Sequence, residues 1–62
     1  MYNFTDREKA VIELLIDGKT NKEIANSLYI SYHTVKAVLE HIYDKVGVHN
    51  RVLLAIKYTK NL

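Results

Sequence analysis

The sequence predicts an all-α fold of four helices, two of which form a helix-turn-helix. The 62-residue chain contains no proline and only two glycines, so little in it interrupts helical patterning. Two helical patterns, at residues 21–28 and 32–46, are separated by only three residues. A connection that short makes two helices cross steeply, which is the geometry of a helix-turn-helix.

The first helix is predicted at about residues 6–17. Thr5 and Glu8 have the spacing of a capping box, in which each side chain bonds the other residue's backbone N–H. Gly18 suits the left-handed conformation that ends many helices. Apolar residues between these signals recur at helical spacing, as expected for a scaffold helix: Val11, Leu14 and Leu15.

The second and third helices are predicted at residues 21–28 and 32–46. Thr20 and Glu23 repeat the capping-box spacing, and Ser31 is a suitable N-cap for the third helix. The inward stripe of the third helix is Val35, Leu39, Ile42 and Val46. At about 100° per residue, its opposite face collects side chains with no evident use in packing: His33, Lys36, Ala37, Glu40 and Asp44.

A fourth helix is predicted at about residues 51–60, after Gly47 ends the third and Asn50 caps the next. Its inward residues are predicted to be Val52, Ala55, Ile56 and Thr59. Leu54 and Tyr58 lie one turn apart on a different face, and we expect both to be partly exposed.

Length and composition limit the classes of function. The chain is short enough to form a single domain, residues 1–62. It has no cysteine, which excludes disulfides and thiolate metal sites and fits a reducing cytoplasm. No apolar run is long enough to span a membrane. A cytoplasmic location is expected.

The chemistry of an enzyme or metal site is also missing from the pattern. The three histidines, His33, His41 and His49, lack the acidic partners and the spacing of a ligand set. A domain of this size offers little cleft for a nucleophile and its base. We therefore expect no catalysis, no metal, no cofactor and no small-molecule ligand in this domain.

The charge distribution favours a polyanionic partner. Residues 1–18 carry a net charge of −2 and residues 19–62 a net charge of +4, within a total of +2. A polyanion would meet the second part of the chain. Solvated lysines are nevertheless common on any helical surface, and charge alone does not decide between these interpretations.

Double-stranded DNA is the polyanion that the helix pattern fits. A helix of this width enters the major groove, where base edges are distinguishable, and helix N-termini bind phosphates. Suitable side chains occur at two predicted N-termini: Thr20, Asn21 and Lys22, and then Ser31, His33 and Thr34. The alternative is that Thr20 and Ser31 are only caps and that Thr34 is a solvated first-turn residue.

The sequence resembles the LuxR-type (GerE-like) helix-turn-helix domain of quorum-sensing regulators and many response regulators. The matching stretches are TDREKAVIELLIDGKTNKEIANSLYIS, then TVK, then IYDKVGVHNR, and the resemblance covers about residues 4–60. No single stretch is specific, whereas the joint pattern is. The resemblance implies sequence-specific DNA binding by a bacterial transcription regulator, as a two-fold dimer.

The resemblance also implies roles for individual residues. Lys36, Ala37 and Glu40 occupy base-reading positions, and His33 shares their face. RNA polymerase is a candidate partner, and the last helix of the family usually forms the dimer contact, here Leu54 and Tyr58. The residues that contact phosphates, or orient those that do, are Thr20, Asn21, Lys22, Ser31, Thr34, Lys45 and Arg51.

Several alternatives remain open. Glu40 replaces a residue that is often basic or neutral, and it either accepts from cytosine N4 or pairs with Lys36. Val38 stands where many members have histidine and adds to packing. Leu54 and Tyr58 are alternatively scattered surface apolar residues. The rival function is a protein-interaction module on the same fold, with little DNA affinity.

Overall fold

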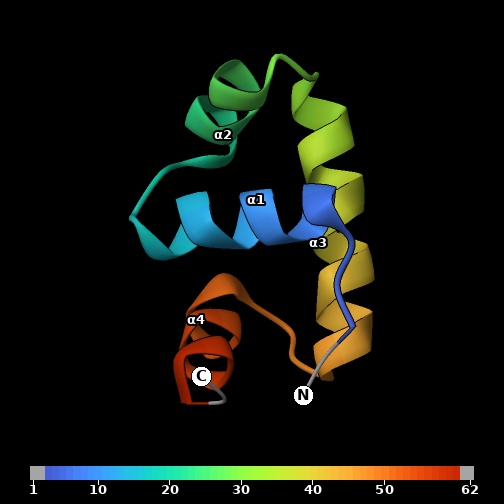
Figure 1. Ribbon diagram of the computed structural model, residues 1–62, viewed down its shortest axis with the longest axis vertical. Helices are drawn as coiled ribbons and strands as arrows, with labels where there is room; N and C mark the ends of the chain where they lie inside the picture. The colour runs from blue at the N-terminus through green and yellow to red at the C-terminus, as the bar shows by residue number, and fades with distance from the viewer. Residues whose placement is uncertain (1–2, 61–62) are drawn as a thin grey trace.

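A computed structural model of the protein describes residues 3–60. It consists of four helices, α1 (Asp6–Ile16), α2 (Asn21–Leu28), α3 (Tyr32–Val46) and α4 (Arg51–Lys60) (Figure 1). The predicted all-α fold is confirmed. The bounds of α2, α3 and α4 match the prediction, whereas α1 ends one residue early, with Asp17 as its C-cap. Residues 1–2 and 61–62 of the predicted domain lie outside the described residues.

Side-chain caps begin all four helices. Thr5 and Thr20 each form a capping box with the glutamate three residues on. Ser31 Oγ accepts from the Thr34 N–H at 3.0 Å, and Asn50 Oδ1 accepts from the Leu53 N–H at 2.9 Å. The predicted caps are confirmed, and they fix the helix starts because each satisfies a backbone donor that the helix itself cannot pair.

The turn between α2 and α3 contains a strained residue. Tyr29 ends α2 with φ 57° and ψ 42°, the left-handed conformation, although it carries a side chain. Its N–H and that of Ile30 both donate to the Ala25 carbonyl. The left-handed conformation costs a side-chain-bearing residue about 1–2 kcal/mol. The two backbone hydrogen bonds to Ala25, together with the buried Ala25 and the partly buried Ile30, offset this cost and hold the turn.

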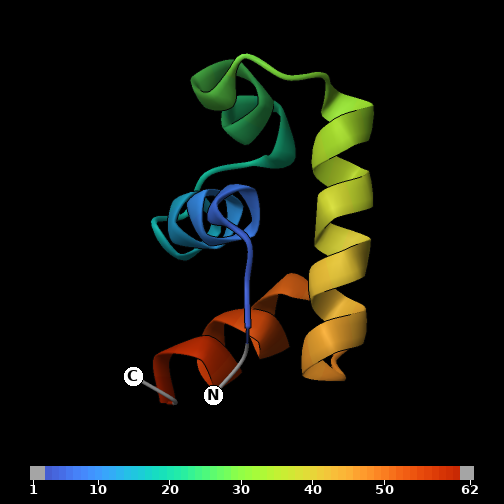
Figure 2. The ribbon, with the colours of Figure 1, turned by 45° about the vertical axis from the view of Figure 1, so that its right-hand side comes forward.

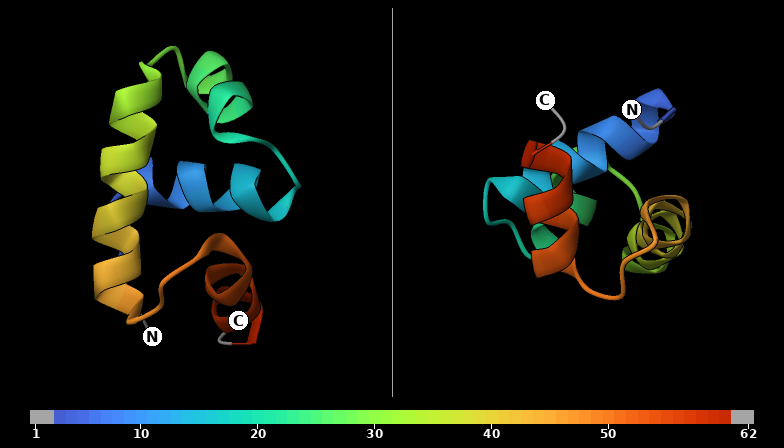
Figure 3. Two further views of the ribbon diagram at one scale, coloured as in Figure 1. Left: turned by 180° about the vertical axis from the view of Figure 1, so that it is seen from behind. Right: turned by 90° about the horizontal axis from the view of Figure 1, so that it is seen from below.

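The long helix α3 connects the whole domain. Figure 2 shows α2, α1 and α4 stacked along one side of it, and each of them contacts it. Seen from behind and from below, no other helix of residues 3–60 lies on its outer side (Figure 3). The predicted inward stripe is buried: Val35, Leu39, Ile42 and Val46. One side of α3 therefore forms the core, and the opposite side is left uncovered.

The predicted orientation of α4 was wrong. Leu54, expected to be partly exposed, has no exposed surface, whereas Val52 and Ile56, expected to face inward, are 64% and 45% exposed. Ala55 is half-buried, and Thr59 is exposed with its hydroxyl donating to the Ala55 carbonyl. Residues 52–56 are all apolar, so periodicity alone could not choose the buried face.

This correction changes the predicted dimer contact. Leu54 is enclosed by the core of its own chain, so its side chain cannot touch a partner in this conformation. Tyr58 is half-buried, and its ring lies 6.0 Å from that of Phe4. The apolar side chains that α4 leaves exposed are instead Val52, Leu53 and Ile56.

Two adjacent leucines provide a test of the observed face. Leu54→Ala should lower the free energy of unfolding by about 2–5 kcal/mol, because it opens a cavity in the core. Leu53→Ala removes the same atoms from a 44% exposed position and should cost less than about 1 kcal/mol. Urea denaturation of both variants checks this. If Leu54→Ala does not fold, Leu54→Val replaces it; equal losses at positions 53 and 54 would contradict the structure.

Candidate nucleic-acid interface

The four predicted base-reading residues share one exposed face of α3. His33, Lys36, Ala37 and Glu40 are all exposed, while Val35 and Leu39 between them are buried. This arrangement follows from the helical period: once one stripe is buried in the core, residues about half a turn away must point to solvent. The exposed face lies on the uncovered side of α3.

An aromatic residue that the sequence interpretation overlooked lies on this face. Tyr32 is 47% exposed, and the Lys36 Nζ lies 5.7 Å from the centre of its ring. The His33 ring meets the same ring edge-on, with 6.1 Å between centroids. The spacing of four between Tyr32 and Lys36 was the available signal. A cation–π contact of this kind is worth about 0.5–1 kcal/mol at an exposed site and restricts where the ammonium lies.

The alternative pairing of Glu40 with Lys36 is absent from the described part of the chain, where neither residue forms an ion pair. Glu40 instead borders a shallow hollow at the C-terminal half of α3, whose other lining residues are Tyr43, Asp44, Val48 and His49. Its carboxylate thus remains exposed on the polar face, with a second carboxylate, that of Asp44, one turn away.

Several residues that were predicted to contact DNA phosphates lie together at the start of α2. Arg51, the first residue of α4, donates from Nη1 to the Asn21 Oδ1 at 3.0 Å and from Nη2 to the Lys19 carbonyl. Arg51 therefore joins the N-termini of two helices and orients the Asn21 amide. The Lys22 side chain is exposed beside them, and Thr20 is occupied in its capping box.

The start of α3 carries the second predicted group. The Ser31 and Thr34 hydroxyls lie 2.9 Å apart, and both side chains are exposed. Ser31 also accepts from the Thr34 N–H, so its cap role is established. One hydroxyl hydrogen of the pair points into the shared bond, and the oxygens otherwise face solvent at a helix N-terminus. A cap used in this way can still lie against a phosphate.

Lys45 lies apart from these groups. Its Nζ is 2.6 Å from the Glu8 Oε1, donates to the Asn3 carbonyl at 3.2 Å, and lies 5.8 Å from the centre of the Phe4 ring. The pairing links the end of α3 to the capping box of α1, across 37 residues of sequence. In the structure, the Lys45 charge is thus shared with a carboxylate of its own chain.

The Glu8 carboxylate is the buried member of this pair. The hydrogen bond from Lys45 holds the pKa of Glu8 below its ordinary value, although burial of the carboxyl opposes this. The Thr5 N–H also donates to the same oxygen, at 2.8 Å, and lowers the pKa further. These two donors satisfy the buried carboxylate, which therefore has a structural role and needs no further hydrogen-bond partner.

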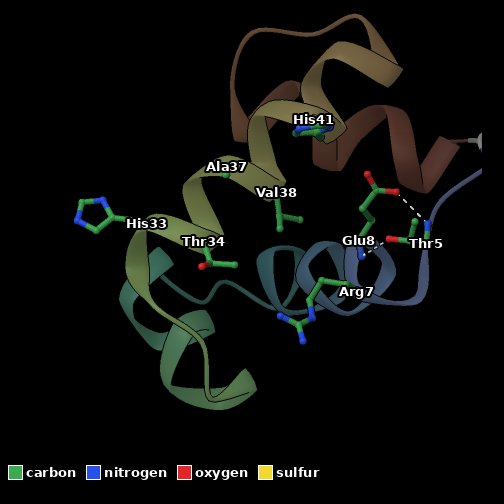
Figure 4. Close-up of a pocket in the computed structure, with 8 residues that line it drawn as sticks. All are labelled: Thr5, Arg7, Glu8, His33, Thr34, Ala37, Val38 and His41. Atoms are coloured by element: carbon green, nitrogen blue, oxygen red, sulfur yellow. Dashed lines mark hydrogen bonds between the residues drawn. The ribbon is translucent and has the colours of Figure 1, made fainter.

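A groove runs between the first turn of α1 and the side of α3, with a volume of about 470 Å³ (Figure 4). Its α3 wall includes Thr34 and Ala37, both predicted DNA contacts, so the groove borders the polar face. Its α1 wall includes Arg7, which the sequence interpretation left without a role. The complete lining is Thr5, Arg7, Glu8, His33, Thr34, Ala37, Val38 and His41.

Other kinds of site find little support. Within residues 3–60, no three histidine or acidic side chains cluster closely enough to hold a metal ion. In that same part of the chain, no helix has the length and hydropathy needed to cross a membrane.

Comparison with known proteins shows the family. Residues 2–58 match the pattern of the GerE family, described as "Bacterial regulatory proteins, luxR family". The chain belongs to the LuxR family. This match confirms the resemblance inferred from the sequence and accounts for the helix-turn-helix.

Three full-length relatives illustrate the context of this LuxR-family domain. The transcriptional regulatory protein DesR of Bacillus subtilis is 50% identical over 48 residues, which are 77% of this chain and 24% of DesR. The uncharacterized transcriptional regulatory protein YhcZ of the same organism is 43% identical over 97% of this chain and 29% of its own length. The uncharacterized response regulatory protein YgeK of Escherichia coli is 46% identical over 81% and 34%. The chain thus spans about a quarter to a third of these relatives.

The Glu8–Lys45 pair of the LuxR-family domain makes stability depend on pH. At pH 7, Glu8→Gln should lower the free energy of unfolding by about 1 kcal/mol, because the charge-assisted bond to the part-exposed Lys45 becomes a bond to a neutral amide. The folded pKa of Glu8 lies below its ordinary value of 4.5, so this stabilisation is present above pH 4.5 and is lost as the pH falls through the folded pKa. Urea denaturation of the parent and of Glu8→Gln, at pH 7 and at pH 3, measures the difference in the free energy of unfolding at each pH.

The matched control is Glu13→Gln, which neutralises an exposed glutamate on the same helix. It should change the free energy of unfolding by less than about 0.5 kcal/mol. A gap between the parent and Glu8→Gln that persists undiminished at pH 3 would show that the ion pair is not its source.

Proposed function

We propose that this LuxR-family domain binds double-stranded DNA sequence-specifically, as part of a bacterial transcription regulator in the cytoplasm. The observation that carries the proposal is the exposed polar face of α3, the longest helix, whose opposite side packs against the rest of the domain. A helix presented in this way matches the width of the major groove. Relatives named as transcriptional regulators support the same function.

Base reading falls to the exposed residues of α3. In the groove, Lys36 would donate to guanine O6 and N7, Ala37 would contact a thymine methyl, and Glu40 would accept from cytosine N4. His33 shares the same exposed face. Tyr32 holds the Lys36 ammonium near the first turn of α3. This leaves the lysine less freedom to lose when it binds a base.

Phosphate contacts fall to the two helix starts. Lys22 and the Asn21 amide, held by Arg51, present donors at the start of α2. Ser31 and Thr34 do the same at the start of α3. Each start also exposes backbone N–H groups and the positive end of a helix dipole, both of which favour an anion. Lys45 holds α3 against α1 through its bond to Glu8. Its side chain stays partly exposed, so its ammonium could also contact a phosphate.

We further propose that the domain binds as a two-fold dimer through α4. Val52, Leu53 and Ile56 form an exposed apolar strip there, beside the half-buried Tyr58. A strip of this kind can pair with its own copy across a two-fold axis. The half-sites would then lie about one helical turn apart. Because the chain covers only part of its relatives, other segments of a longer regulator, and RNA polymerase at the promoter, are additional expected partners.

The second candidate is a protein-interaction module on the same fold. The observations that favour it are the exposed carboxylates of Glu40 and Asp44 on the polar face and the modest net charge of +2. Carboxylates near a phosphate backbone weaken binding by repulsion. In this case, α3 and α4 would bind a protein partner instead of DNA.

Salt dependence separates the two functions. If about four phosphates are neutralised, affinity for duplex DNA should fall about 100-fold between 50 and 200 mM salt, because the released counterions must be bound again. Lys36→Ala should weaken binding to a duplex selected from a random library by about 1–3 kcal/mol, as a lost base contact does. Fluorescence anisotropy titrations measure both effects.

The control is Lys60→Ala, which removes the same charge from the exposed C-terminal end of α4. It should leave the preference for the selected duplex over a random one unchanged. Affinity that is absent or insensitive to salt would exclude the proposed function. Equal affinities for the parent and Lys36→Ala would exclude the assignment of α3 to the groove.

A further inference from the structure

The groove between α1 and α3 contains a cation without a structural partner. Arg7 is exposed and forms no hydrogen bond or ion pair with any residue of the described range 3–60. Its nearest carboxylate along the groove, Glu8, is already bonded to Lys45 and to the Thr5 N–H. The guanidinium is therefore not needed to neutralise the groove.

The position of Arg7 relates it to the polar face of α3. Figure 4 shows its side chain extending from α1 toward the N-terminal half of α3, where Thr34 lies. The first turn of α1 overlaps the middle of α3 in Figure 1, and the view from below shows this end of α1 beside α3 (Figure 3). Arg7 thus flanks the face that carries Ala37 and Lys36 without belonging to the same helix.

The dimensions of DNA imply that a side chain beside α3 would lie close to phosphates. The major groove is about 12 Å wide, and an α-helix with its side chains has a diameter of about 10–12 Å. A helix in the groove therefore has a phosphate backbone close on both sides. Any cation held beside α3 and turned toward its polar face meets one of those backbones. A planar guanidinium suits phosphate oxygens particularly well, because it can donate two parallel hydrogen bonds.

We propose that Arg7 is a phosphate-binding residue of the DNA interface, contacting the backbone along the edge of the groove that α3 enters. This inference rests on the proposed DNA-binding function and extends it to a helix outside the helix-turn-helix. Thr34 lines the opposite wall of the same groove and would lie against the same backbone. Arg7 adds affinity and fixes the register of α3, and it reads no bases.

The chain offers a matched control on the same helix. Lys9 is exposed and carries the same charge, but it does not line the groove. Two residues along an α-helix turn the side chain by about 200°, so Lys9 points away from α3. Arg7→Gln and Lys9→Gln change the net charge equally, and a difference between them therefore reports a local contact.

The experiment is a salt titration of duplex binding for the parent, Arg7→Gln and Lys9→Gln, followed by fluorescence anisotropy. Loss of one phosphate contact should reduce the slope of log affinity against log salt by about 0.9 for Arg7→Gln. The fall in affinity between 50 and 200 mM salt would then be roughly threefold smaller than in the parent. Lys9→Gln should retain the parent slope. The ratio of affinities for selected and random duplexes should not change in either variant.

The possible results distinguish failure of the Arg7 contact from failure of the proposed DNA-binding function. If the parent binds DNA with the expected salt dependence but Arg7→Gln and Lys9→Gln behave alike, the Arg7 contact is excluded and the proposed function stands. If the parent shows no salt-dependent binding, both are excluded. Should Arg7→Gln lower the thermal unfolding midpoint, Arg7→Lys decides: a slope restored to the parent value supports the contact, and one equal to that of Arg7→Gln excludes it.

Discussion

Burial of one side of α3 determines how the domain is arranged and which residues it exposes. Its apolar stripe, from Val35 to Val46, is buried against the other three helices, and each of them packs against this one helix. Within residues 3–60, no helix packs on the opposite side of α3. The stripe that stabilises the domain therefore also exposes Lys36, Ala37 and Glu40. Stability and the candidate interface are two consequences of one pattern.

The polar contacts that connect the helices lie at helix ends. Arg51 binds the start of α2, and Lys45 binds Glu8 at the start of α1. These bonds fix the directions in which the helix N-termini point, and helix N-termini are where an anion binds. In this small domain, hydrogen bonds between helices thus fix helix directions that core packing would fix in a larger domain. The same residues are accordingly both scaffold and part of the proposed interface.

The helices and the polar face could be predicted because their signals are local. Caps such as Ser31 and Asn50 lie within three residues of the N–H groups they bind, and the period of α3 alone separates Val35 from Lys36. The face of α4 could not be predicted, because its apolar run offers several equivalent stripes and only packing selects Leu54. The Glu8–Lys45 pair joins residues 37 apart and leaves no local trace. Arg7 gained a candidate role only once folding placed it beside α3.

A two-dimensional ¹⁵N–¹H NMR titration with a selected duplex tests whether the polar face of α3 contacts DNA. The domain, at 7.2 kDa, is small enough for every amide to be followed. The largest shifts should fall on the polar face of α3, around Lys36, Ala37 and Glu40, with further shifts at the start of α2. Unchanged α3 amides, with shifts confined to α4 or to the C-terminal half of α1, would contradict the account.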